Sequence, residues 1–299
     1  MTGPLHIVFE PGFFSSGTVH AALVMGAVVA AVTGTVGTFT VLRAQSFAGH
    51  ALGELGATGG SAAFLAGTNP LAGFVGIAVI SAAVIEALGL RRPRTRDLAT
   101  GLVLGAGLGL AALFLYLDTT STSTTGASIT ILFGSLFAVS NSMVPSVVGL
   151  GGLALALVAV CYRMLLLGSL DADMAAAKGV PVRVVGAVYL LALALAVSLA
   201  AETIGAVLST ALLVGPPASA LRLTKQPGRA VVTSAVTGIA ACWLGVLLAY
   251  DSYYWPPVRH GWPVSFLIVA IIFVFYLGVD VCSPGRRHRR PVLEASADA

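Results

Sequence analysis

The chain has 299 residues, of which 57% are hydrophobic and only 9% are charged. Soluble domains carry about 25% charged residues, because a surface in contact with water needs them. The composition therefore excludes a cytosolic enzyme, a nucleic-acid-binding domain and a disordered protein, and it predicts an all-α polytopic membrane protein. The formal net charge of +4 indicates no nucleic-acid partner, since half of the 16 Lys and Arg residues lie in two clusters beside apolar stretches, Arg91–Arg96 and Arg286–Arg290.

Nine mostly apolar stretches follow one another along the chain, and each is long enough to cross a bilayer as a helix of about 20 residues. They lie near residues 18–42, 47–66, 70–90, 97–117, 144–167, 184–202, 203–222, 228–250 and 262–280. Each is too long for a barrel strand, and the alternation of a barrel is missing. The stretch at 47–66 is rich in Gly and contains two ionisable residues, so we expect eight or nine membrane helices, with eight if this stretch is re-entrant.

Basic residues at alternate boundaries of these stretches predict the orientation of the chain. They are Arg43, Arg91–Arg96, Arg163, Lys178, Arg183, Arg222, Lys225, Arg229 and Arg286–Arg290. With nine crossings, this pattern places the N-terminus outside and the C-terminus inside. We expect an N-terminal lead (residues 1–17), a transmembrane domain (18–280) in the lipid of the cytoplasmic membrane, and a basic, disordered cytoplasmic tail (281–299).

His50 and Glu54 are ionisable residues inside an apolar stretch, where such groups are costly and mark functional sites. At i and i+4 of a helix their side chains share one face. An imidazole nitrogen and a carboxylate oxygen there could both contact one divalent cation. Two copies of the chain at a twofold axis would present four such ligands. The structural alternative is that the two side chains hydrogen-bond each other to reduce the cost of burial.

Glu202 lies at the junction of the sixth and seventh stretches. Facing an outer vestibule, its carboxylate would attract cations, so we include it among the candidate metal-contact residues. The structural alternative is a solvated turn residue at the membrane edge.

Residues 169–181 form a polar segment between the fifth and sixth stretches, on the predicted inner side. Ser169 and Asp171 can cap a short helix, and Gly179 with Pro181 can end it. A permease needs such a cytoplasmic helix to receive force from a motor subunit, although the segment could also be a simple connector. The candidate coupling residues are Asp171, Asp173, Met174, Ala177, Lys178 and Gly179.

Six short motifs, in the correct order from about Phe9 to Leu277, resemble the membrane permease of the zinc/manganese/iron class of ATP-binding-cassette (ABC) importers. They are Phe9–Pro11 with Phe13 and Phe14, residues 41–54, Ile131–Leu136 with Val139 and Ser140, Asp171–Pro181, Gly205–Ala218, and Ser252–Tyr254 with Pro257 and Gly261. The family usually has Gly-Asp-Ala-Leu-Ser-His where this chain has Gly49–Glu54. Its Asp and His are therefore replaced by His50 and Glu54, which keeps one imidazole and one carboxylate on one face. Glu202 replaces a frequent Gln, and the usual Pro after Asp171 is missing.

The resemblance implies a homodimer with two cytosolic ABC ATPase subunits and an extracytoplasmic metal-binding protein. The chain has no Walker lysine, so we expect it to be no enzyme, to hold no tightly bound cofactor, and to pass a divalent metal ion as cargo. Nitrogen and oxygen ligands permit zinc, manganese or iron, and one His with one Glu per chain favours zinc slightly. Two alternatives are a permease of the same architecture for a metal chelate or corrinoid, and a stand-alone ion-coupled carrier.

Overall fold

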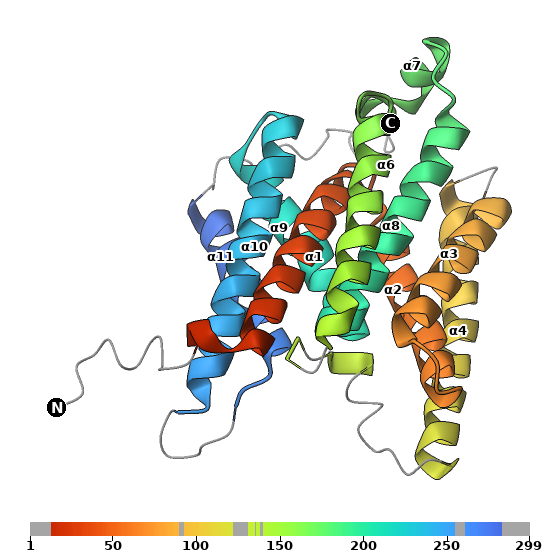
Figure 1. Ribbon diagram of the computed structural model, residues 1–299. Helices are drawn as coiled ribbons and strands as arrows, with labels where there is room; N and C mark the ends of the chain where they lie inside the picture. The colour runs from red at the N-terminus through yellow and green to blue at the C-terminus, as the bar shows by residue number, and fades with distance from the viewer. Residues whose placement is uncertain are drawn as a thin grey trace, which may run out of the picture.

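A computed structural model describes residues 13–89, 93–121, 131–134, 136–137, 140–254 and 261–282. Within these ranges the chain is all-helical (Figure 1). The long helices are α1 (Gly17–Leu42), α2 (Ser46–Leu65), α3 (Pro70–Gly89), α4 (Pro93–Ser121), α6 (Val144–Leu170), α8 (Val182–Ile204), α9 (Ala206–Leu223), α10 (Pro227–Ser252) and α11 (Val264–Cys282). The short helices are η2 (Phe13–Ser15), η3 (Asn141–Met143) and α7 (Ala172–Ala177).

The long helices match the nine predicted stretches, with every boundary within four residues of its predicted place. Eight of them, all except α2, are long and apolar enough to cross a membrane. The predicted all-α polytopic fold is therefore confirmed. The N-terminal lead and the basic tail lie largely outside the described residues, as do Arg91, Arg92 and the cluster Arg286–Arg290.

Helix α2, the long helix that does not qualify as a membrane span by length and composition, lies inside the bundle. It packs against α3, α4, α8 and α9, and every residue from 51 to 61 is buried. A helix surrounded by protein needs no apolar face toward lipid, which explains why its Gly and polar residues are tolerated there. It is one continuous helix of 20 residues, about 30 Å long at 1.5 Å per residue, and not a re-entrant loop.

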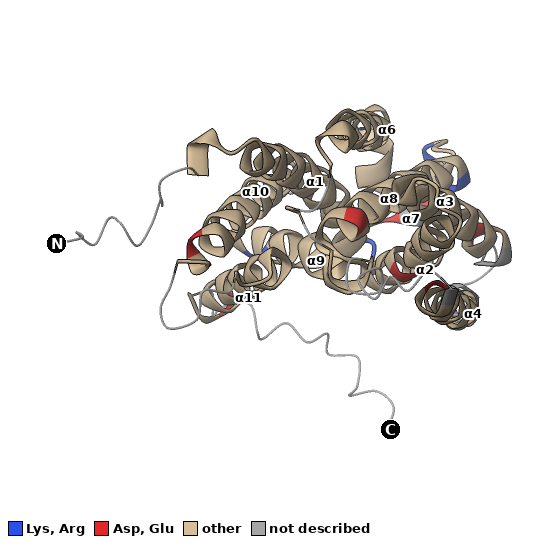
Figure 2. Ribbon diagram, turned by 60° about the horizontal axis from the view of Figure 1, so that its bottom comes forward, with Lys and Arg blue, Asp and Glu red and all other residues tan. Residues whose placement is uncertain are grey.

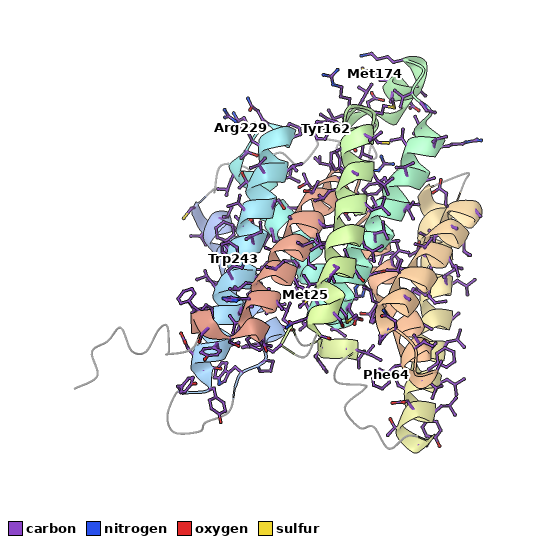
Figure 3. The ribbon with its side chains drawn as sticks, in the orientation of Figure 1. Met25, Phe64, Tyr162, Met174, Arg229 and Trp243 are labelled. Carbon is purple, nitrogen blue, oxygen red and sulfur yellow. The ribbon has the colours of Figure 1, made fainter. Side chains whose placement is uncertain are left out.

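Successive long helices run in opposite directions, so α1 begins at one end of the bundle and α11 ends at the other (Figure 1). Figure 3 shows Met174 of α7 and Arg229 of α10 at one end and Phe64 of α2 at the other. The helix boundaries at the α7 end also carry Arg43, Lys178, Arg183, Arg222 and Lys225. By the positive-inside rule, this concentration of basic residues indicates that the α7 end faces the cytoplasm.

The crossing of α2 and α3 is made by two glycines. A Cβ atom built on Gly59 would lie 2.0 Å from the carbonyl oxygen of Gly73, and one built on Gly73 would lie 2.2 Å from the carbonyl oxygen of Gly59. Small residues allow membrane helices to approach this closely. The pair fixes α2 against α3 at a distance that any side chain would increase.

Candidate functional site

The candidate site lies on the buried helix α2, where it meets α9. Figure 2 shows α2 with α4, α8 and α9 around it, and Glu54 is the only acid in the sequence of α2. Glu54 is 7% exposed, and His50, one turn earlier, is half-buried. The structure therefore places both predicted residues in the interior of the bundle, on one face of one helix.

His50 and Glu54 form no hydrogen bond with each other, although they lie close enough to interact electrostatically. Nδ1 of His50 instead lies 2.9 Å from Oγ1 of Thr210 on α9, a hydrogen-bonding distance. The structural alternative raised by the sequence, a hydrogen-bonded pair of His50 and Glu54, is not what the structure contains. The carboxylate of Glu54 and Nε2 of His50 are therefore available to a ligand.

Small residues on α2 explain how Thr210 reaches His50. A Cβ atom on Gly49 would lie 2.6 Å from Cδ2 of Leu213, and one on Gly53 would lie 3.1 Å from Oγ of Ser209. These two glycines, at i and i+4, let α9 approach α2 beside the candidate site. Thr210 is 160 residues from His50 in sequence, so no local pattern could have predicted their contact.

One chain supplies few ligands. Among the described residues, no group of three or more His, Cys, Asp and Glu side chains could hold a metal ion. Glu202 does not join His50 and Glu54 in such a group. It lies half-buried in the last turn of α8, next to the abrupt α8–α9 turn that Gly205 makes with a φ of 102°. Glu202 therefore lies near the end of the bundle opposite α7, and it does not belong to the candidate site on α2.

One face of α9 remains open although five helices, α1, α2, α8, α10 and α11, pack against it. The half-buried or exposed residues of α9 include a set with helical spacing along one face, namely Val207, Thr210, Ala211, Val214 and Ala218. Because Thr210 is one of them, the open face of α9 passes directly beside His50.

The predicted coupling segment contains the short helix α7, which is narrower than the predicted span of 169–181. Oδ1 of Asp171 accepts a hydrogen bond of 2.8 Å from the backbone N–H of Met174, so Asp171 is the N-cap. The prediction that Ser169 also caps this helix is wrong. The preceding helix α6 continues to Leu170, and the Ser169 hydroxyl donates to the carbonyl oxygen of Leu165 within it.

Most of the surface of α7 is open to solvent. Ala175 is fully buried against the bundle, whereas Met174 is 50% exposed. The other predicted coupling residues are also exposed, and they are Asp171, Asp173, Ala177, Lys178 and Gly179. Ala175 thus anchors the helix and leaves the predicted contact residues accessible at the cytoplasmic end.

The family model of the ABC 3 transport family matches residues 15–279. The chain belongs to the ABC 3 transport family. It is 28% identical over 247 residues to the manganese transport system membrane protein MntC of Listeria innocua, and the match covers 82% of this chain and 86% of that protein.

Two solved structures share the fold of this ABC 3 family member. One is PsaBC from Streptococcus pneumoniae in complex with Fab, with a TM-score of 0.78, 25% identity, and coverage of 93% of this chain and 96% of that one. The other is a metal-chelate type ABC transporter in an inward-facing conformation, with a TM-score of 0.73 and 14% identity, covering 91% and 88% of the two chains.

Family membership confirms the resemblance predicted from the six motifs. The chain is a multi-pass membrane permease of the metal class of ABC importers, and the ATPase of the complex is a separate subunit. The alternative of a stand-alone carrier is thereby excluded.

Proposed function

We propose that this chain is the permease of an ABC importer for manganese, and that His50 and Glu54 contact the ion as it passes. The observation that carries the proposal is a histidine and a carboxylate on one face of a buried helix, with no hydrogen bond between them. Ionisable groups buried among membrane helices are costly, so their retention without a hydrogen bond between them points to an ionic cargo.

Manganese is favoured over zinc by the relatives. The slight preference for zinc in the sequence rested on one His with one Glu per chain, whereas a protein similar over most of the chain is named for manganese transport. Carboxylate and imidazole ligands suit manganese as well as zinc. No cysteine lies on α2 or α9, so the candidate site has no thiolate that would favour zinc or copper.

A second copy of the chain would complete the ligand set. One chain brings His50 and Glu54 only, and two chains around a twofold axis would bring two of each. The open face of α9, which runs past His50, is a surface that such a partner could cover. A site with few protein ligands per chain also suits transit, because an ion that is bound too tightly would not leave.

The exposed residues of α7 are proposed to contact the ATPase subunit. Force applied there reaches α6 and α8 directly, since α7 packs against both. An extracytoplasmic metal-binding protein would dock at the opposite end of the bundle, where Glu202 lies near the surface and would attract the released cation.

The test is transport by the purified complex of this chain with its ATPase subunit in liposomes, with manganese, zinc and iron offered separately. We expect uptake of manganese that requires ATP and the metal-binding protein. Uptake without ATP would contradict the proposal, and so would uptake of a metal chelate or corrinoid with none of the free ion.

A further inference from the structure

The hydroxyl of Thr210 points away from its own helix, unlike the hydroxyls of several other threonines in the bundle. The hydroxyls of Thr33, Thr38 and Thr203 donate to carbonyl oxygens four residues back in their own helices. Such bonds are the ordinary way for a threonine to satisfy its hydroxyl inside a membrane. Thr210 instead directs its hydroxyl from α9 to Nδ1 of His50 on α2.

The partner of Nδ1 decides what Nε2 can do. A neutral imidazole carries a hydrogen on one ring nitrogen and a lone pair on the other. When Nδ1 holds the hydrogen and donates it to an oxygen, Nε2 keeps the lone pair that a metal ligand needs. When the hydroxyl donates to Nδ1, Nε2 carries the hydrogen and cannot bind a cation.

We propose that Thr210 is a positioning residue of the transit site: its hydroxyl accepts the Nδ1–H of His50 and so holds the ring in the tautomer whose Nε2 is free for the ion. The proposal rests on the proposed role of His50 as a metal contact. It adds that affinity for the ion depends on α9, a helix that supplies none of the His, Asp or Glu ligands considered above.

The geometry around the pair supports a positioning role. The half-buried His50 ring lies next to Gly49, whose missing side chain admits Leu213, and Gly53 admits Ser209 on the next turn. These contacts set the distance between α2 and α9, and the bond to Thr210 then sets the rotation of the ring. Partners that orient a metal-binding histidine in this way are worth about 10–100-fold in metal affinity.

The first test compares Thr210→Val, which removes the hydroxyl and keeps the shape, with Thr210→Ser, which keeps the hydroxyl. Thr203→Val is the matched control, because that buried hydroxyl bonds only within α8. In the reconstituted complex we expect Thr210→Val to raise the manganese concentration for half-maximal uptake by about 10–100-fold. For Thr210→Ser and Thr203→Val, the manganese concentration for half-maximal uptake should stay close to that of the unchanged protein. Equal concentrations for Thr210→Val and Thr203→Val would overturn the proposal.

The second test reads the tautomer without any metal. Nitrogen-15 NMR of the histidine-labelled, metal-free complex, with His50→Gln to assign the signal, distinguishes protonated from unprotonated ring nitrogens. We expect an unprotonated Nε2 in the unchanged complex and a loss of this single tautomer in Thr210→Val. A protonated Nε2 in the unchanged complex at neutral pH would overturn the proposal even if Thr210→Val fails to assemble.

The two proposals fail in distinguishable ways. Normal uptake by His50→Ala would contradict the proposed metal contact itself. Loss of uptake in His50→Ala together with unchanged affinity and tautomer in Thr210→Val would leave the metal contact in place and refute only the role of Thr210.

Discussion

The contact of Gly59 and Gly73 holds α2 inside the bundle, so a methyl group at this crossing should destabilise the whole permease. In Gly73→Ala, the new Cβ atom would lie 2.2 Å from the carbonyl oxygen of Gly59 and 2.7 Å from Cβ of Ala63. Carbon and oxygen atoms in van der Waals contact are about 3.3 Å apart, so the helices must separate by about 1 Å. Overpacking of this kind costs about 1–3 kcal/mol.

Gly76→Ala on the same helix is the matched control, since a Cβ atom there meets nothing within 4 Å. Both variants gain the same helix propensity, about 1 kcal/mol, so their difference isolates the crossing. At about 2–4 °C per kcal/mol for a chain above 150 residues, Gly73→Ala should unfold about 2–12 °C below Gly76→Ala in detergent. Tryptophan fluorescence during heating measures this. Equal unfolding temperatures would refute the close packing of α2 against α3.

Two further predictions concern single hydrogen bonds. Asp171→Ala removes the N-cap of α7, which is worth about 0.5–2 kcal/mol, and should lower metal-dependent ATP hydrolysis by the reconstituted complex. Ser169→Ala, in the last turn of α6, should leave this hydrolysis unchanged, and equal losses in both variants would contradict the assignment of the cap. Trp243→Phe removes the 3.1 Å bond from the indole N–H to the carbonyl oxygen of Leu23 and should cost about 0.5–1.5 kcal/mol. Unfolding of this variant at the temperature of the unchanged protein would show that the bond between α10 and α1 contributes nothing.

The sequence predicted the membrane helices well, because segments that are buried in lipid or protein are rich in apolar residues, and this enrichment is a local property of the sequence. The α2 segment shows where that signal weakens. Its glycines and Glu54 make it too polar for a lipid-facing span, and only the surrounding helices explain its place. The sequence still predicted that His50 and Glu54 share one face of a helix, because a spacing of four residues is a local property of a helix.

Contacts between distant segments could not be predicted in the same way. Thr210 belongs to a motif of the family, but nothing in the residues around it points to His50. For Ser169 the local sequence instead gave a wrong prediction, because a serine shortly before an acidic residue is a common N-cap pattern. Helix α6 continues three residues past its predicted end at residue 167, and this extension placed Ser169 inside a helix.

Metal uptake by Glu54→Gln and His50→Ala tests the central claim most directly. Glu54→Gln keeps the size of the side chain and removes its charge, while Glu86→Gln on α3 and His20→Ala, on the exposed start of α1, control for loss of a membrane acid and of an imidazole. We expect both site variants to assemble with the ATPase subunit and to abolish manganese uptake, with near-normal uptake in both controls. Normal uptake by Glu54→Gln and His50→Ala would contradict the claim that the ion passes between these side chains.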